Sequence, residues 1–332
     1  MAFRATQVAL NPLDYFLQSD MEYQRLRVSD ILLRTNLDPR EIFSQLIRLA
    51  TNSHWSHNAL LYLLNDPVQG FDNTFLVEAM TTGVRVASLR NEIEPPEQFN
   101  VGIRRLLLDW YIETPQEVAQ HNTSDLEDTH GIAFLRHVRG MAVDQINGLY
   151  SHNVVNELAS LYIERISKRY HVPLVGALAD DFARLFEKWD ESPESIQTVT
   201  RFICSGLVQY SYFAALRRRI INAMDGARDV AMSNLSNMQH IIFRPDPEGI
   251  VPDYIQQVQT GKLKLSDALP VQVSNFLKTT TPADFNNSTN LAWCYIIFKG
   301  TVWQIEDAPD TYMPKSDDEK HILAIIAPEH RG

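Results

Sequence analysis

The stretch Phe202-Ile203-Cys204-Ser205-Gly206-Leu207-Val208 opens a helical pattern in the second half of the chain. Apolar residues follow one another there in steps of four, at Cys204, Val208, Tyr212, Leu216 and Ile220. This period places them on one side of a helix, so we expect an amphipathic helix over residues 202–224 with the cysteine in its first turn. The N–H groups and the dipole at a helix start stabilise a thiolate, and the same N–H groups can bind an oxyanion. The alternative is a structural cysteine, because free cysteine often packs as a small apolar residue.

A thiolate nucleophile needs a general base, and His57 is the best candidate among the ten histidines. Residues 57–64 and 74–80 have the composition of two strands, joined by the loop NDPVQGFDN. A hairpin symmetric about residues 65–70 pairs His57 with Glu78. Opposite side chains of an antiparallel pair lie about 5 Å apart, so Glu78 can hold one ring nitrogen of His57 and fix its tautomer. Alternatives are a turn histidine with a surface carboxylate, or a zinc site of His54, His57 and Glu78, which lacks the helical i,i+4 spacing of the common motif.

The segments around these residues complete a mixed pattern of helices and strands. Residues 28–35 form a short apolar run that indicates a buried strand. The sequence Asp38-Pro39-Arg40-Glu41 then supplies a cap, a helix-starting proline and a capping-box acid. Residues 91–201 show mainly helical patterns, whereas residues 291–305 have the aromatic and β-branched content of a late hairpin.

Several short motifs together resemble a known family. They are Ser29-Asp30-Ile31-Leu32, then Ser53-His54-Trp55-Ser56-His57-Asn58-Ala59-Leu60, then Val77-Glu78-Ala79, then Cys204-Ser205-Gly206-Leu207-Val208, and the segment TPADF at 281–285. This order resembles the circularly permuted papain-like cysteine hydrolases, the YiiX-like branch of the NlpC-type amidase and peptidase superfamily, which is related to lecithin retinol acyltransferase. The resemblance covers about residues 28–90 and 198–305. It implies a permuted papain-like α+β fold, with an antiparallel sheet packed on the cysteine-bearing helix.

The resemblance also implies roles for single residues. Cys204 would be the nucleophile, with its own amide in the oxyanion hole; His57 would be the general base and then the acid, and Glu78 the orienting third member. Trp55 and Ser205 are candidate substrate contacts, although a tryptophan at the start of a strand more often packs in the core. Neither a cofactor nor a metal is expected.

The sequence departs from the family pattern at several positions. Ser29 replaces a glycine, Asn58 stands where a valine follows the histidine, and Ala59 stands where a glycine does. The long segment before the cysteine has no counterpart. The expected organisation is a first part of the core at 1–90, a helical insertion at 91–197, a second part of the core at 198–307, and a tail at 308–332. The insertion is a candidate lid, specificity wall or surface for a protein partner.

Charge and composition narrow the function classes. The chain has 41 acidic and 30 basic residues, a net charge of −11, so it lacks the basic footprint of a nucleic-acid or anionic-membrane binder. Its two cysteines, Cys204 and Cys294, cannot form a CxxC motif. No apolar run approaches the roughly 18 residues of a membrane span. The start of the chain lacks the pattern of a Sec signal, which predicts a cytoplasmic protein, or one exported by a signal-independent secretion system.

The sequence therefore predicts a cysteine hydrolase that acts on amide bonds, including those of cell-wall peptides, through a Cys-His-Glu triad and an acyl-enzyme. One alternative keeps the thiol but uses a lipid acyl donor, as in an acyltransferase, thioesterase or phospholipase. Another is an inactive papain-like scaffold that binds a partner protein. The reactivity of the thiol separates the scaffold from the two enzymes.

Overall fold

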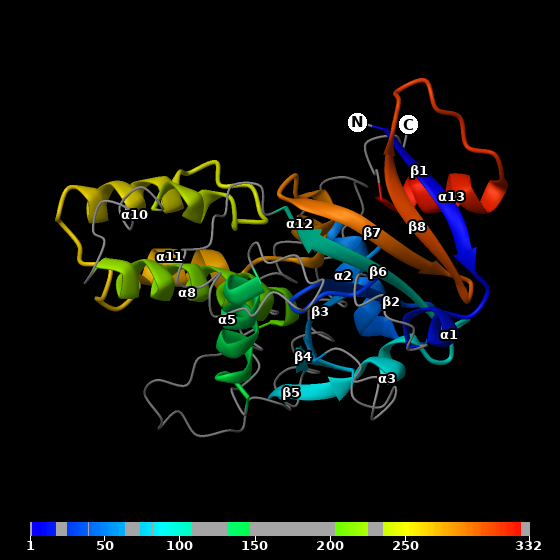
Figure 1. The fold of residues 1–332 in the computed structure, drawn as a ribbon, viewed down its shortest axis with the longest axis horizontal. Coiled ribbons are helices and arrows are strands. Elements are labelled where there is room, and N and C mark those ends of the chain that lie inside the picture. Colours follow the sequence, from blue (N-terminus) through cyan, green and yellow to red (C-terminus); the bar gives the residue numbers. More distant parts are fainter. Residues whose placement is uncertain are drawn as a thin grey trace, which may run out of the picture.

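The chain folds around an antiparallel sheet, and the computed structural model describes it over residues 2–17, 25–38, 40–63, 74–80, 83–107, 132–146, 203–224 and 235–326. The sheet has eight strands in the order β1-β8-β7-β6-β2-β3-β4-β5 (Figure 1). The strands are β1 (Ala2–Ala9), β2 (Ile31–Asn36), β3 (His57–Leu63), β4 (Phe75–Met80), β5 (Gly83–Ser88), β6 (Phe99–Leu106), β7 (Leu291–Phe298) and β8 (Thr301–Ala308). Since β7 and β8 lie between β1 and β6, both ends of the chain build the same sheet. The α+β class expected from the sequence is confirmed.

Helices cover both faces of this sheet. They are α1 (Pro12–Leu17), α2 (Ile42–Thr51), α3 (Leu89–Ile93), α5 (Ile132–Val143), α8 (Cys204–Met224), the 3-10 helix η2 (Ser236–Gln239), α10 (Ile250–Gln259), α11 (Val271–Lys278), α12 (Pro282–Asn287) and α13 (Asp317–Ile326). On one face α8 contacts β3 and β4, with α5 and α11 beside it. Alternate side chains of a strand point to opposite faces, so Ile31 and Leu33 join the core under α8 while Leu32 joins the second core with α3.

The predicted late hairpin is confirmed as β7 and β8. Its turn residues, Lys299 and Gly300, both have positive φ, of 50° and 75°. A two-residue turn with positive φ at both positions matches the right-handed twist of the strands it joins. In the sheet, β7 pairs with β6 and β8 pairs with β1, so the C-terminal part of the chain lies against the N-terminal strands.

The structure corrects the sequence-based expectations in three places. The predicted helical insertion at 91–197 contains a strand, β6, which pairs with β2 and β7 inside the sheet. The expected tail at 308–332 contains α13, whose residues Ile322, Ile325 and Ile326 are buried. At the other end, β1 was not predicted, because only one of its residues is buried and the strand lacks an apolar run. Of the segment 91–201 with predicted helical patterns, residues 132–146 form α5 and a following turn, whereas residues 108–131 and 147–201 lie outside the described residues.

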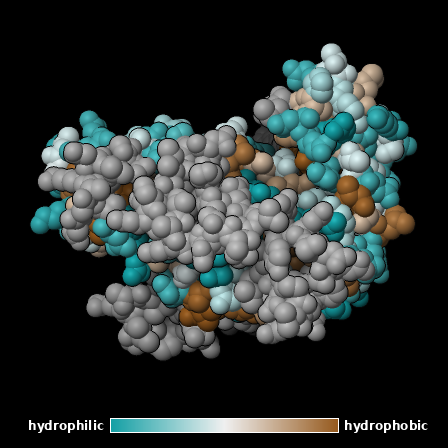
Figure 2. Space-filling view, in the orientation of Figure 1, coloured by the Kyte–Doolittle hydropathy of each residue, from teal (hydrophilic) through white to brown (hydrophobic). Residues whose placement is uncertain are grey.

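The described surface is mixed in character. Figure 2 shows mostly hydrophilic residues around α13 and the β1–β8 edge, with hydrophobic groups interspersed. The large apolar side chains that are exposed come from separate elements: Leu10, Leu37, Val86, Leu107, Val271 and Met313. In the part of the chain that is described, no helix combines the length and the apolar character needed to cross a membrane.

Candidate active site

Cys204 is the first residue of α8, as the sequence predicts. The residue before it, Ile203, has no side-chain acceptor with which to cap the helix. The first hydrogen bond within this turn runs from the Leu207 N–H to the Ile203 carbonyl, at 3.0 Å. The N–H groups of Cys204, Ser205 and Gly206 thus have no partner within the helix. They and the helix dipole make the surroundings of the thiol favourable to negative charge.

The first turn of α8 is held close to the end of α11. A Cβ placed on Gly206 would lie 2.2 Å from the carbonyl oxygen of Lys278. Only a glycine permits this approach between two backbones. Gly206 therefore sets how closely the first turn of α8, which carries Cys204, approaches the end of α11.

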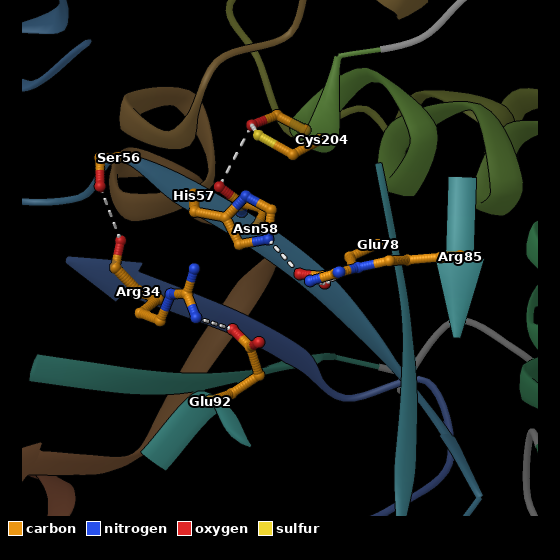
Figure 3. Close-up of polar contacts among 9 residues, drawn as sticks. Arg34, Ser56, His57, Asn58, Glu78, Arg85, Glu92 and Cys204 are labelled. Atoms are coloured by element: carbon orange, nitrogen blue, oxygen red, sulfur yellow. Dashed lines mark hydrogen bonds and ion pairs between the residues drawn. The ribbon is translucent and has the colours of Figure 1, made fainter. Parts of the chain in front are cut away.

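His57 is the first residue of β3, and it lies beside Glu78 of β4. The predicted pairing of these two strands is confirmed, but Ala59 rather than His57 lies opposite Glu78. The predicted register is wrong by two residues because the described pairs centre between residues 68 and 69, one residue further along the chain than predicted. A shift of two keeps the same face of the sheet, so the His57 ring reaches Glu78 diagonally. Their Nε2 and Oε2 atoms are 2.7 Å apart (Figure 3).

Glu78 is the centre of a buried charge network. It is fully buried, and its other oxygen, Oε1, accepts hydrogen bonds from Nε and Nη2 of Arg85 at 2.8 and 2.7 Å. Burial raises the pKa of Glu78, but the hydrogen bonds and positive charges of His57 and Arg85 lower it more, to about 2. The carboxylate is therefore ionised at neutral pH and is ready to hold a protonated imidazole.

The second nitrogen of the His57 ring faces Cys204. Because Nε2 faces Glu78, Nδ1 is the nitrogen on the side of the thiol (Figure 3). Burial lowers the pKa of His57, but the charge and hydrogen bond of the Cys204 thiolate, followed by those of Glu78, outweigh it and raise the pKa to about 10. Burial raises the pKa of Cys204, whereas the charge and hydrogen bond of His57 bring it below the ordinary thiol value. The geometry favours a thiolate–imidazolium pair.

Two further side chains lie against the thiol. Ser205 Oγ is 3.7 Å from Cys204 Sγ and donates a hydrogen bond of 3.1 Å to Asn58 Oδ1. The main-chain N–H of Asn58 also bonds to Cys204. The sequence singled out Ser205, but it gave Asn58 no role. The only sequence signal for Asn58 is that a polar residue directly follows the histidine, where the family pattern has a valine.

Trp55 does not line a cleft in this structure. Its ring is fully buried and packs on Gly102 and Trp293, and its Nε1 donates a hydrogen bond of 2.7 Å to Asn286 Oδ1. The predicted substrate contact is replaced by packing, because Gly102 leaves room for both indole rings. Cys294, on β7, is partly buried, and burial raises its pKa to about 11, which makes it a weak nucleophile at neutral pH.

The residues described include one group that could hold a metal ion, formed by His57, Glu78 and Glu92. Both carboxylates already face guanidinium groups, Glu78 with Arg85 and Glu92 with Arg34. A cation at this point would have to displace these two ion pairs. The donor set therefore fits an imidazole held by carboxylates better than a metal centre.

Comparison of the chain with protein-family models, with curated proteins and with solved structures found no match. The case for a function thus depends on the geometry of the site.

Proposed function

We propose that this protein is a cysteine hydrolase that cleaves amide bonds in peptides, including those of cell walls, with Cys204, His57 and Glu78 as its catalytic triad. The observation that carries the proposal is the position of the His57 ring. One of its nitrogens is bonded to the buried Glu78, and the other faces a cysteine at a helix start. The resemblance of the sequence to permuted papain-like hydrolases supports the same residues, and we extend the proposal to that fold. A cytoplasmic location, or export by a signal-independent system, belongs to the proposal as well.

In the first half of the reaction the Cys204 thiolate attacks the carbonyl carbon and forms an S–C bond, while the π electrons of the carbonyl move to its oxygen. The oxyanion lies at the start of α8, where the main-chain N–H of Cys204 can bind it. The electron pair then returns, the C–N bond breaks, and His57 gives its proton to the leaving amine. Glu78 keeps the ring in the orientation that this transfer needs.

In the second half the neutral His57 takes a proton from water, which attacks the thioester carbonyl. The C–S bond breaks and the acid product leaves. The Cys204 thiolate and the protonated His57 are restored, and no cofactor is consumed.

The acyl-enzyme provides the test. p-Nitrophenyl acetate, a small activated ester, is mixed with the folded protein; nitrophenolate release is followed and the acetylated residue is mapped by mass spectrometry. We expect a burst of product and an acetyl group on Cys204. Both should be lost in Cys204→Ala, strongly reduced in His57→Ala and kept in Cys294→Ala. Equal rates for the wild type and Cys204→Ala, with no acetyl group on Cys204, would contradict the proposal and favour the scaffold. Peptide amides and lipid esters are then compared as donors, and turnover of lipid esters alone would move the assignment to the lipid class.

A further inference from the structure

Asn58 contributes a buried hydrogen-bond donor that nothing in the described part of the chain accepts. Its side chain is fully buried on β3, next to His57. Its Oδ1 accepts the hydrogen bond of Ser205, whereas its Nδ2 has no partner among the described residues. A buried amide donor without an acceptor costs free energy, and in native proteins such a group commonly has a functional reason. The acceptor that would satisfy it is an oxygen.

The carboxamide of Asn58 is linked to the nucleophile through Ser205. It contacts Ser205 Oγ, which is itself 3.7 Å from Cys204 Sγ. Asn58 has the same strand parity as Leu60, which belongs to the core formed with Leu207 of α8, so both side chains point toward that helix. The carboxamide is therefore held beside the first turn of α8, where the carbonyl oxygen of a substrate becomes negative.

The hydrogen bond from Ser205 determines which end of the Asn58 carboxamide remains available to another group. Because its hydroxyl donates to Oδ1, the oxygen end of Asn58 is occupied and the amino end is left for another acceptor. The side chain of Ser205 is fully buried as well, so this orientation is held by the core. Ser205 is in this sense a positioning residue.

We propose that Asn58 is a further catalytic residue whose Nδ2 donates a hydrogen bond to the carbonyl oxygen of the substrate as it becomes an oxyanion. The inference rests on the proposed function, because it needs acyl transfer to Cys204. When the S–C bond forms, the displaced π electrons reside on this oxygen, and Nδ2 and the Cys204 N–H bind it from two directions. When the electrons return and the C–N bond breaks, both hydrogen bonds weaken. Donors of this kind stabilise the transition state more than the substrate.

The test compares two reactions of the same thiol. Iodoacetamide alkylates Cys204 by displacement at a saturated carbon and forms no oxyanion. p-Nitrophenyl acetate acylates it through a tetrahedral oxyanion. In Asn58→Leu, which keeps the branching at Cγ but has no donor, we expect acylation to slow by about 10²–10³-fold, the usual effect of losing one oxyanion donor. The alkylation rate and its pH profile should stay close to those of the wild type.

A matched control makes the same substitution elsewhere. Asn100 of β6 is also a buried strand asparagine, and its Nδ2 lies 2.9 Å from His54 Nε2. Asn100→Leu should leave the ratio of acylation to alkylation unchanged. If Asn58→Leu fails to fold, as judged by circular dichroism, the smaller change Asn58→Ala replaces it, with Asn100→Ala as its control.

Three results would overturn the inference. They are equal losses of acylation and alkylation in the Asn58 variant, no loss of acylation, and an equal change of the ratio in the Asn100 variant. The failure of the proposed function looks different. In that case the wild-type Cys204 itself reacts with both reagents no faster than free cysteine does.

Discussion

Replacing Gly206 with alanine tests whether the contact between α8 and α11 sets the position of the nucleophile. The new Cβ would lie 2.2, 2.8 and 2.9 Å from the carbonyl oxygen, carbonyl carbon and Cα of Lys278. All three are backbone atoms, so no side-chain rotation relieves the clash. Since ordinary van der Waals contact begins near 3.4 Å, the two helices must separate by about 1 Å.

Two opposing effects set the magnitude. Overpacking of a close contact costs about 1–3 kcal/mol, whereas exchanging glycine for alanine inside a helix gains about 1 kcal/mol. Because the clash involves rigid backbone, we take the upper end of the cost and expect a net loss of about 2 kcal/mol in the free energy of unfolding. A displacement of about 1 Å at a catalytic group lowers the rate on the order of 100-fold, so acylation of Cys204 should fall by a similar factor.

Urea unfolding and acetylation by p-nitrophenyl acetate measure the two effects. Gly140→Ala is the matched control, because Gly140 lies in α5 and a Cβ there meets no atom within 4 Å. We expect that control to gain up to about 1 kcal/mol and to acylate like the wild type. The reasoning is refuted if Gly206→Ala is as stable as the wild type and reacts at the same rate.

Three further changes test other parts of the structure. Glu78→Gln keeps the shape of the buried side chain but removes its charge, so the pKa of His57 should fall. Alkylation of Cys204 near pH 6 should then slow about tenfold, and an unchanged rate would remove Glu78 from the proposed triad. Arg104 donates to four main-chain carbonyls around the end of α12. Arg104→Met should therefore lower the free energy of unfolding, measured by chemical denaturation, by about 3 kcal/mol or more. A decrease below about 1 kcal/mol would contradict this role. Burial raises the pKa of Glu319, but the hydrogen bonds it accepts, one from the Ala5 N–H, bring it below 4.5. The ionised Glu319 therefore stabilises the fold fully above pH 4.5, and this contribution is lost as the pH falls. In Glu319→Gln the free energy of unfolding should decrease less steeply with falling pH below 4.5; the same decrease as in the wild type would contradict a stabilising role for this contact.

The sequence predicted the main parts of the site because they have local signals. The period of four from Cys204 marks a helix, and the pair of apolar runs around one loop marks the hairpin of His57 and Glu78. The error of two residues in register did not matter for the site, since side chains two apart on a strand share a face. Asn58 was missed because its importance depends on which of its hydrogen bonds are satisfied, and only the packed structure shows that.

β6 was missed for a comparable reason. Its sequence, FNVGIRRL, places a glycine and two arginines where a central strand would ordinarily have apolar residues. Gly102 makes room for two indole rings, Arg104 binds the carbonyls around α12, and Arg105 forms an ion pair with Asp30. Each of these partners is distant in the sequence. The composition of the strand makes sense only after the sheet has formed.

Alkylation of Cys204 by iodoacetamide, measured from about pH 5 to pH 9, tests the central claim most directly. With His57 protonated up to a pKa of about 10, the lowered pKa of Cys204 should give fast labelling well below the ordinary thiol pKa, with little further rise toward pH 9. In His57→Ala the charge and hydrogen bond of His57, which do most to lower the pKa of Cys204, are lost, so the rise in labelling should move to higher pH. Cys294 should stay unlabelled throughout. Labelling of Cys204 only near pH 9, with the same profile in His57→Ala, would contradict the account.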